Sequence, residues 1–188
     1  HTKEKQGKGG CLMSKNGWIP LNAHVIASAS VVGNREKHGP IGECFDMYDL
    51  TDRFEQKTWE MAESEMQRRA LNLAIKKAKI KESDLGAIFA GDLLNQCVGA
   101  AYGLMDFPSP YFGLYGACST VAEGMILSGI CATYRVFETC AAVASSHYCT
   151  AERQYRTPIE YGGQRTPTAQ WTVTGAGAYL IGYGGGAV

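Results

Sequence analysis

The stretch from Gly86 to Thr150 is nearly free of charge, and it constrains the fold more than any other part of the sequence. Within it, short apolar runs alternate with segments in which small and apolar residues recur at helical spacing. We predict strands over 85–90, 111–115 and 137–145, and helices over 95–104 and 120–134. An alternation of strand and helix places parallel strands in one sheet, with the helices as crossovers. The sequence therefore predicts an α/β domain with this stretch as its interior.

The clearest helix is predicted from Thr58 to Ile80, where apolar residues recur every three or four positions between glutamates and lysines. Thr58 is the expected N-cap. The lysines at the other end suit the C-terminal helix dipole, although a nucleic-acid patch is an alternative interpretation of them. Residues 15–57 mix short apolar pieces with loop signals, so we expect one strand and a long excursion there.

The charges of the chain cancel, because 18 basic residues face 18 acidic ones. No net field attracts nucleic acid or an anionic membrane surface, so any anion site must be local and no nucleic-acid partner is expected. The seven cysteines are an odd number without a CxxC pair, which favours reduced thiols. Three of them, Cys97, Cys131 and Cys140, lie in apolar runs typical of core packing.

Neither end of the sequence has the pattern of a targeting segment. Residues 1–14 are polar and glycine-rich, without a secretory signal peptide, and are expected to be a disordered or artificially added tail. The uncharged stretch 166–188 is long enough to cross a bilayer, but its prolines, glycines and polar residues argue against a span. We therefore expect no transmembrane helix.

A turn of small residues carries the clearest chemical signal in the chain. The run Tyr111-Phe-Gly-Leu-Tyr-Gly-Ala-Cys118-Ser-Thr leads from a predicted strand into a predicted helix. Cys118 would then lie at a helix N-terminus, where unpaired N–H groups and the helix dipole favour a thiolate or a bound anion. Gly116 and Ala117 are small enough for the tight turn of a nucleophile elbow. An inert structural cysteine is the alternative, since free cysteines commonly pack in cores.

Other segments resemble the ketoacyl synthase and thiolase superfamily, in which a glycine-rich strand follows the cysteine elbow. They are 137–146, 166–170 and the run TVTGAGAYLI at 172–181. Longer blocks resemble the stage V sporulation protein AD family of endospore formers. These blocks are AGDLLNQ (90–96), GACST (116–120), SSHYCTAERQYR (145–156), EYGGQ (160–164) and PTAQWTVTGAGA (167–178). The resemblance covers about residues 15–185, including the helix that begins TWEMAE at residue 58.

The resemblance implies a thiolase-like fold of two similar halves, each a βαβαβαββ unit with a mostly parallel mixed sheet covered by helices. Residues 15–188 would form the N-terminal half-domain, with a ligand pocket at the junction of the halves. Synthases and thiolases complete their cysteine site with histidines or an asparagine from the second half, which this sequence lacks. We therefore expect a non-catalytic binding component, with Cys118 as the nucleophile-equivalent residue. A cysteine-dependent acyltransferase or condensing enzyme is the alternative, and a purely structural subunit is a third.

The family resemblance also implies a ligand, namely pyridine-2,6-dicarboxylate (dipicolinic acid) or its calcium chelate, taken up into the forespore. It implies other stage V sporulation A membrane proteins as partners, a homodimer, and a location on the cytoplasmic face of, or peripheral to, the spore inner membrane. No cofactor or metal site is expected. A flat dianion needs an apolar slot with donors or cations at both ends.

The candidate ligand-binding residues are donors, cations and polar residues near the elbow. They are Cys118, Ser119, Thr120, His147, Arg153, Arg156, Arg165, Asp92, Asn95 and Gln164. Each has a structural alternative. The arginines could pair with surface glutamates, and His147 could bond to backbone in the core or at a dimer contact. Asp92 and Asn95 could cap the next helix, and Gln164 could lie at the junction or the dimer face.

Overall fold

A computed structural model describes residues 20–155, 168 and 170–184 of the chain. Six strands form one sheet, in the order β2-β1-β6-β5-β3-β4. The strands are β1 (Ala23–Val32), β2 (Met47–Tyr48), β3 (Ala87–Gly91), β4 (Tyr111–Gly113), β5 (Thr139–Ser146) and β6 (Gly175–Tyr183). The α-helices are α1 (Asn34–Lys37), α2 (Trp59–Ala78), α3 (Val98–Leu104), α4 (Thr120–Thr133) and α5 (Tyr148–Tyr155). Short 3₁₀ turns are η1 (Gly42–Cys44), η2 (Glu82–Asp84), η3 (Asn95–Cys97) and η4 (Ala117–Ser119).

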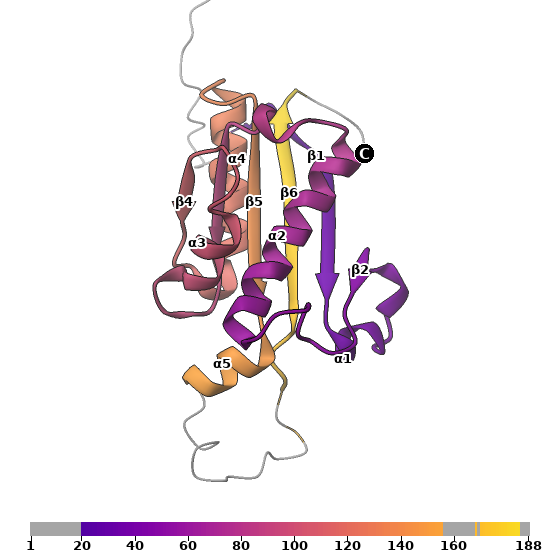
Figure 1. Cartoon of the computed structure of the whole chain (residues 1–188). Helices are drawn as coiled ribbons and strands as arrows, with labels where there is room; N and C mark the ends of the chain where they lie inside the picture. Colours follow the sequence, from indigo (N-terminus) through magenta and orange to yellow (C-terminus); the bar gives the residue numbers. More distant parts are fainter. Residues whose placement is uncertain (1–19, 156–167, 169, 185–188) are drawn as a thin grey trace, which may run out of the picture.

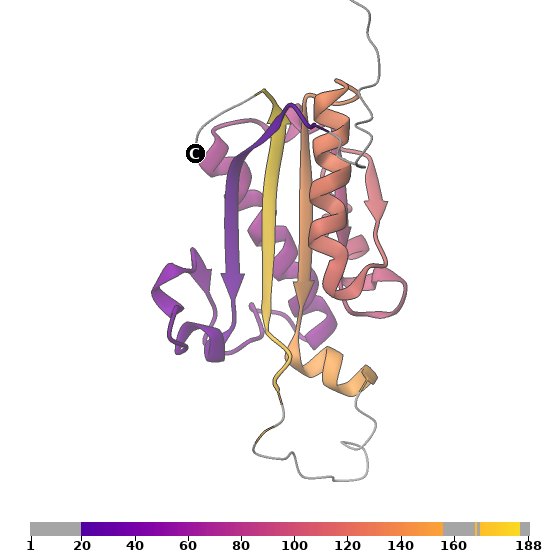
Figure 2. The same ribbon diagram turned by 180° about the vertical axis from the view of Figure 1, so that it is seen from behind.

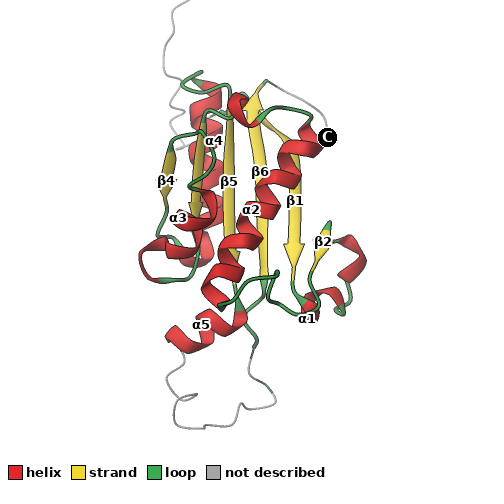
Figure 3. Cartoon of the chain, in the orientation of Figure 1, coloured by secondary structure: helices red, strands yellow, loops and turns green. Residues whose placement is uncertain are grey.

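The sheet is sandwiched between helices. Helices α2 and α3 cover one face (Figure 1), and α4 lies against the other face, as the view from behind shows (Figure 2). Helix α5 follows β5 at one end of the sheet, as Figure 3 shows. The predicted α/β architecture is thereby confirmed.

Parallel pairing holds the charge-poor stretch together as predicted. β3 lies between β4 and β5, and both pairs are parallel. The sheet is mixed because β6 runs antiparallel to both β5 and β1. Upstream, the single strand expected in 15–57 is β1, to which the structure adds the two-residue β2. The glycine-rich segment supplies β6, whose buried small residues fit between two long strands.

The helix expected over 95–104 is shorter than predicted. Its first turn is the 3₁₀ turn η3, and α3 begins only at Val98. The reason is local, because Gln96 and Cys97 have left-handed φ angles of +59° and +52°. An α-helix cannot run through such residues.

The long helix α2 follows its predicted pattern closely. Thr58 is its N-cap, and its hydroxyl accepts a hydrogen bond from the Met61 N–H at 3.2 Å. The helix ends where Lys79 adopts a left-handed conformation with φ of +56°. The buried apolar face packs on the sheet to form the main core, with Ala62, Met66, Ala70, Leu71 and Ala74 fully buried.

Helix α4 packs on the opposite face through small residues. Gly124 is buried, and a Cβ there would lie 3.1 Å from Cβ of Ala142 and 3.3 Å from the carbonyl oxygen of Phe89. On the same helix, Ile126 is 55% exposed in the described structure. Within the described part of the chain, no helix is both long enough and apolar enough to cross a membrane.

Candidate functional site

The candidate site is an elbow between β4 and α4. After β4 the chain stays bonded to β3, since the Leu114 N–H donates to the Ala90 carbonyl at 2.8 Å. It then turns through Gly116 and enters η4, where Cys118 is exposed. Ala117, immediately before the cysteine, has a left-handed φ of +46°. The predicted strand, tight turn and helix around Cys118 are all present.

Two glycines make this turn sterically feasible. A Cβ on Gly116 would lie 2.5 Å from Oε2 of Glu123 and 2.9 Å from the Thr120 nitrogen. A Cβ on Gly91, at the end of β3, would lie 2.3 Å from the carbonyl oxygen of Leu114. Atoms at such distances overlap, so only glycine fits at either position without displacement of the elbow.

The helix start differs in detail from the expected one. The N–H of Ser119 donates to the Gly116 carbonyl at 2.9 Å, and the N–H of Thr120 donates to the Ala117 carbonyl. The backbone N–H groups of Ser119 and Thr120, two of the predicted ligand-binding residues, are therefore already engaged within η4. Helical hydrogen bonding begins before α4, so Cys118 lies inside the first turn. The Thr120 side chain is buried.

Asp92 directly follows β3 and stabilises a turn that contacts the elbow. Its carboxylate accepts hydrogen bonds from the N–H groups of Leu94 and Ala100, both at 2.6 Å. Burial raises the pKa of this carboxyl. The thiol of Cys97 donates to the Leu114 carbonyl at 3.0 Å, which links the Asp92 turn to the elbow. Asp92 thus makes the capping contacts that were the structural alternative to a ligand role. Asn95 starts η3, and its side chain lies outside the described structure.

His147 lies in the core. Its Nε2 donates to the Asp52 carbonyl at 2.9 Å, and its Nδ1 accepts from the Cys149 N–H at 3.1 Å. The Trp59 ring lies 5.3 Å from the imidazole, centroid to centroid. Burial lowers the pKa of the ring, which favours the neutral form. Both ring nitrogens are hydrogen-bonded within the protein. This geometry matches a core histidine, which was the structural alternative, and not a ligand-binding one.

Of the predicted arginines, the structure places only the backbone of Arg153. Arg153 belongs to α5, which begins at the carboxyl end of β5. Because β3, β4 and β5 are parallel, this is the edge that also carries Asp92 and the elbow. The side chain of Arg153, and all of Arg156, Gln164 and Arg165, lie outside the described residues.

The sequence interpretation missed a buried polar cluster next to this edge. Glu63 is fully buried on α2, and its carboxylate accepts from the hydroxyls of Ser145 at 2.9 Å and Thr150 at 2.8 Å. Gln67 is also fully buried, and its amide donates to Ser145 Oγ at 2.7 Å and to the Gly91 carbonyl at 3.2 Å. The sequence did contain a signal for this cluster, because both polar residues fall on the apolar face of the helical pattern.

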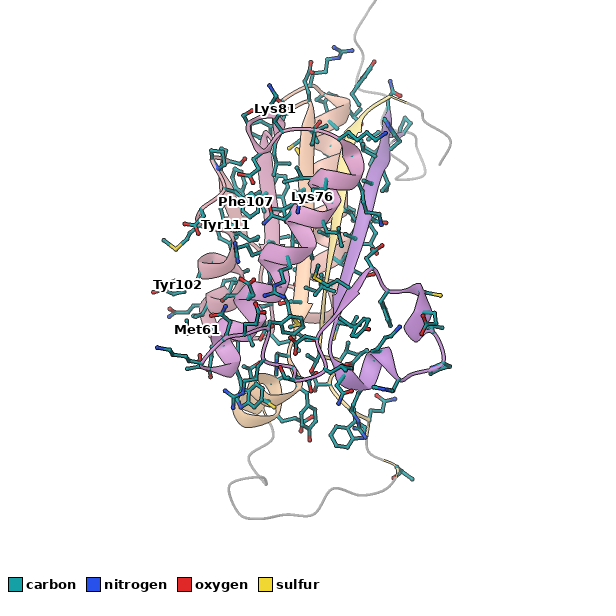
Figure 4. All side chains as sticks on the ribbon, turned by 45° about the vertical axis from the view of Figure 1, so that its right-hand side comes forward. Met61, Lys76, Lys81, Tyr102, Phe107 and Tyr111 are labelled. Atoms are coloured by element: carbon teal, nitrogen blue, oxygen red, sulfur yellow. The ribbon has the colours of Figure 1, made fainter. Side chains whose placement is uncertain are left out.

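A separate groove lies between α2 and α3. It has a volume of about 390 Å³, and its apolar lining includes Met61, Val98 and Tyr102. Figure 4 shows Met61 and Tyr102 on the same side of the molecule. None of the predicted site residues that the structure describes lines this groove, and no residue of the elbow does.

The fold, including its cysteine elbow, is thiolase-like. The structure is similar to OleA of Xanthomonas campestris, with a TM-score of 0.57 and 13% identity over 86% of this chain and 56% of that one. It is similar to 3-oxoacyl-(acyl carrier protein) synthase III of Xanthomonas oryzae, with a TM-score of 0.56 and 15% identity over 86% and 56%. The priming β-ketosynthase of the R1128 polyketide pathway gives a TM-score of 0.54 and 15% identity over 88% and 52%.

Sequence similarity then identifies the family. Residues 15–188 match the family model of stage V sporulation protein AD. The stage V sporulation protein AD of Bacillus subtilis (strain 168) is 39% identical over 171 residues, which cover 90% of this chain and 51% of that protein. The chain belongs to the stage V sporulation protein AD family, and it spans about half the length of these relatives.

Proposed function

We propose that the protein containing this chain is a non-catalytic sporulation protein that binds dipicolinate for uptake into the forespore. The observation that carries the proposal is the match of residues 15–188 to the stage V sporulation protein AD family. The geometry supports it, because the elbow, the Asp92 turn and α5 lie at the carboxyl edge of parallel strands, where α/β proteins commonly bind ligands.

The elbow offers part of what a flat dianion needs. Cys118 is exposed in the first turn of a helical segment, where the dipole favours an anion. Tyr115, three residues earlier, is 69% exposed, and we propose that its ring stacks on the planar ligand. We propose that Arg153 on α5 provides a cation for one carboxylate.

Calorimetry on the full-length protein tests the binding function. We expect saturable heat with dipicolinate, and weaker heat with isophthalate, which lacks the ring nitrogen, and with picolinate, which lacks one carboxylate. Substitution Arg153→Ala should weaken binding by about tenfold or more, as for loss of a charged hydrogen bond. The matched control is Lys76→Ala, which removes an equal charge from an exposed position near the far end of α2. Equal heats for all three acids would refute the proposal.

We also propose a homodimer that works beside the membrane proteins of the same sporulation stage. The supporting feature is β4, which ends the sheet and pairs only with β3 among the described strands. Phe112, the middle residue of β4, is 45% exposed. An edge strand of this kind pairs readily with a second copy. Light scattering should show a dimer that Phe112→Lys weakens; a monomer at all concentrations would contradict it.

A second candidate function is acyl transfer at Cys118, favoured by its exposure on a ketosynthase-like elbow. In that reaction the thiolate attacks the acyl-CoA carbonyl and the CoA thiolate leaves, so that a protein thioester forms. Incubation with acyl-CoA followed by intact mass measurement decides the question. An acyl adduct that disappears in Cys118→Ala would establish the transferase, whereas an unmodified mass favours the binding protein.

A further inference from the structure

The polar cluster under α2 contains a carboxyl group in an unusual setting. Glu63 is fully buried, with its two oxygens each accepting one hydroxyl hydrogen bond, from Ser145 at 2.9 Å and Thr150 at 2.8 Å. Among the described residues, no lysine or arginine forms an ion pair with it. A buried carboxylate without a cation is costly, because hydroxyl donors replace only part of its hydration.

A second buried acid raises this cost. A Cβ on Gly99 of α3 would lie 3.1 Å from Oδ2 of Asp92 and 3.3 Å from Cγ of Glu63, so the two acids flank the same glycine. Asp92 repels the charged form of Glu63. Helix α3 itself carries no charged residue. Among the described residues of β5 and α5, the groups that bond to the carboxylate are hydroxyls, and Glu152 of α5 accepts a hydrogen bond from the Thr172 hydroxyl.

The hydroxyls around Glu63 can serve a neutral carboxyl as well as a charged one. Thr150 Oγ1 also lies 3.0 Å from the carbonyl oxygen of His147. If Glu63 takes up a proton, its O–H can donate to Thr150 Oγ1, whose own hydrogen then goes to the His147 carbonyl. Ser145 continues to donate to the other carboxyl oxygen. Protonation therefore needs only hydroxyl rotations and no movement of the backbone.

We propose that Glu63 is a proton-binding switch that makes the packing of α2 against β5 and α5 tighter when the carboxyl is protonated. Burial, with Asp92 as a smaller cause, raises its pKa to about 7. An unfolded chain holds this proton only below the ordinary glutamate pKa of about 4.3. Stability from Glu63 is therefore fully present below about pH 4 and is lost as the pH rises toward 7.

The test compares unfolding of the full-length protein by urea from pH 5 to 8.5 in the wild type and in Glu63→Gln. The ratio of their folding equilibrium constants should fall by about tenfold per pH unit up to about pH 7, and then level off. The ratio is required because the neutral His147 contributes a pH dependence of opposite sign to both proteins. The matched control is Glu65→Gln on the same helix, whose carboxylate pairs with Arg68 and Arg69. The ratio of the folding equilibrium constants of wild type and Glu65→Gln should stay constant from pH 5 to 8.5.

A ratio of wild type to Glu63→Gln that does not change with pH would overturn the proposal. If Glu63→Gln fails to fold, Thr150→Val provides the second test. The Thr150 hydroxyl lowers the pKa of Glu63, so its removal should shift the bend in the stability curve to higher pH. An unmoved bend in Thr150→Val would equally refute a switch at Glu63.

Discussion

Gly91 sets the position of the elbow at the scale of a single residue. It ends β3, and the site for a Cβ there is taken by the Leu114 carbonyl oxygen at 2.3 Å and by Cγ2 of Thr120 at 2.9 Å. Substitution Gly91→Ala should therefore push the elbow away from the sheet and lower the free energy of unfolding by about 1–3 kcal/mol. Urea unfolding measures the change. Gly177→Ala is the control, since its nearest neighbour would lie 3.9 Å away; equal losses would contradict the steric argument.

His147 gives a pH-dependent prediction at the same scale. Its pKa is lowered in the folded protein, so the unfolded state binds more protons below about pH 6.5. The stability that wild type has over His147→Gln should thus be present at neutral pH and shrink as the pH falls from 6.5 toward 5. The loss should be at most about 1.4 kcal/mol per pH unit. The control is His38→Gln, which replaces an exposed histidine. Its difference from wild type in free energy of unfolding should not shrink in this way as the pH falls.

At the scale of the element, α2 depends on its N-cap as well as on its packing. The Thr58 hydroxyl satisfies the N–H of Met61, which would otherwise lack a partner in the first turn. We expect Thr58→Ala to lower the free energy of unfolding by about 1 kcal/mol. Thr58→Ser retains the oxygen and should remain close to wild type. If both variants have the wild-type midpoint of urea unfolding, the cap contributes nothing to stability.

At the scale of the whole molecule, the chain presents an apolar surface on α4. Ile126 is 55% exposed there, and the chain spans about half the length of its family relatives. We expect the 188-residue chain expressed alone to self-associate, because association buries an exposed apolar helix face. Sedimentation velocity should show oligomers that Ile126→Glu reduces. A monodisperse monomer with a cooperative melting transition would contradict this expectation.

The sequence by itself determined the order of the elements. Apolar runs and helical spacing are local properties, so they predicted β3, β4, β5, α2 and α4 and the turn at Cys118. Family resemblance predicted the thiolase-like class, which the similar solved structures support.

The tertiary structure alone decided the environment of each polar side chain. Glu63 is acidic and sits in a helix, yet it is fully buried, because packing of α2 on the sheet turns that position toward β5 and α5. His147 follows β5 at the carboxyl edge of the parallel strands, but its ring turns into the core toward Asp52 and Trp59. Burial and hydrogen-bond partners depend on segments far apart in sequence, and no local pattern specifies which of these segments meet.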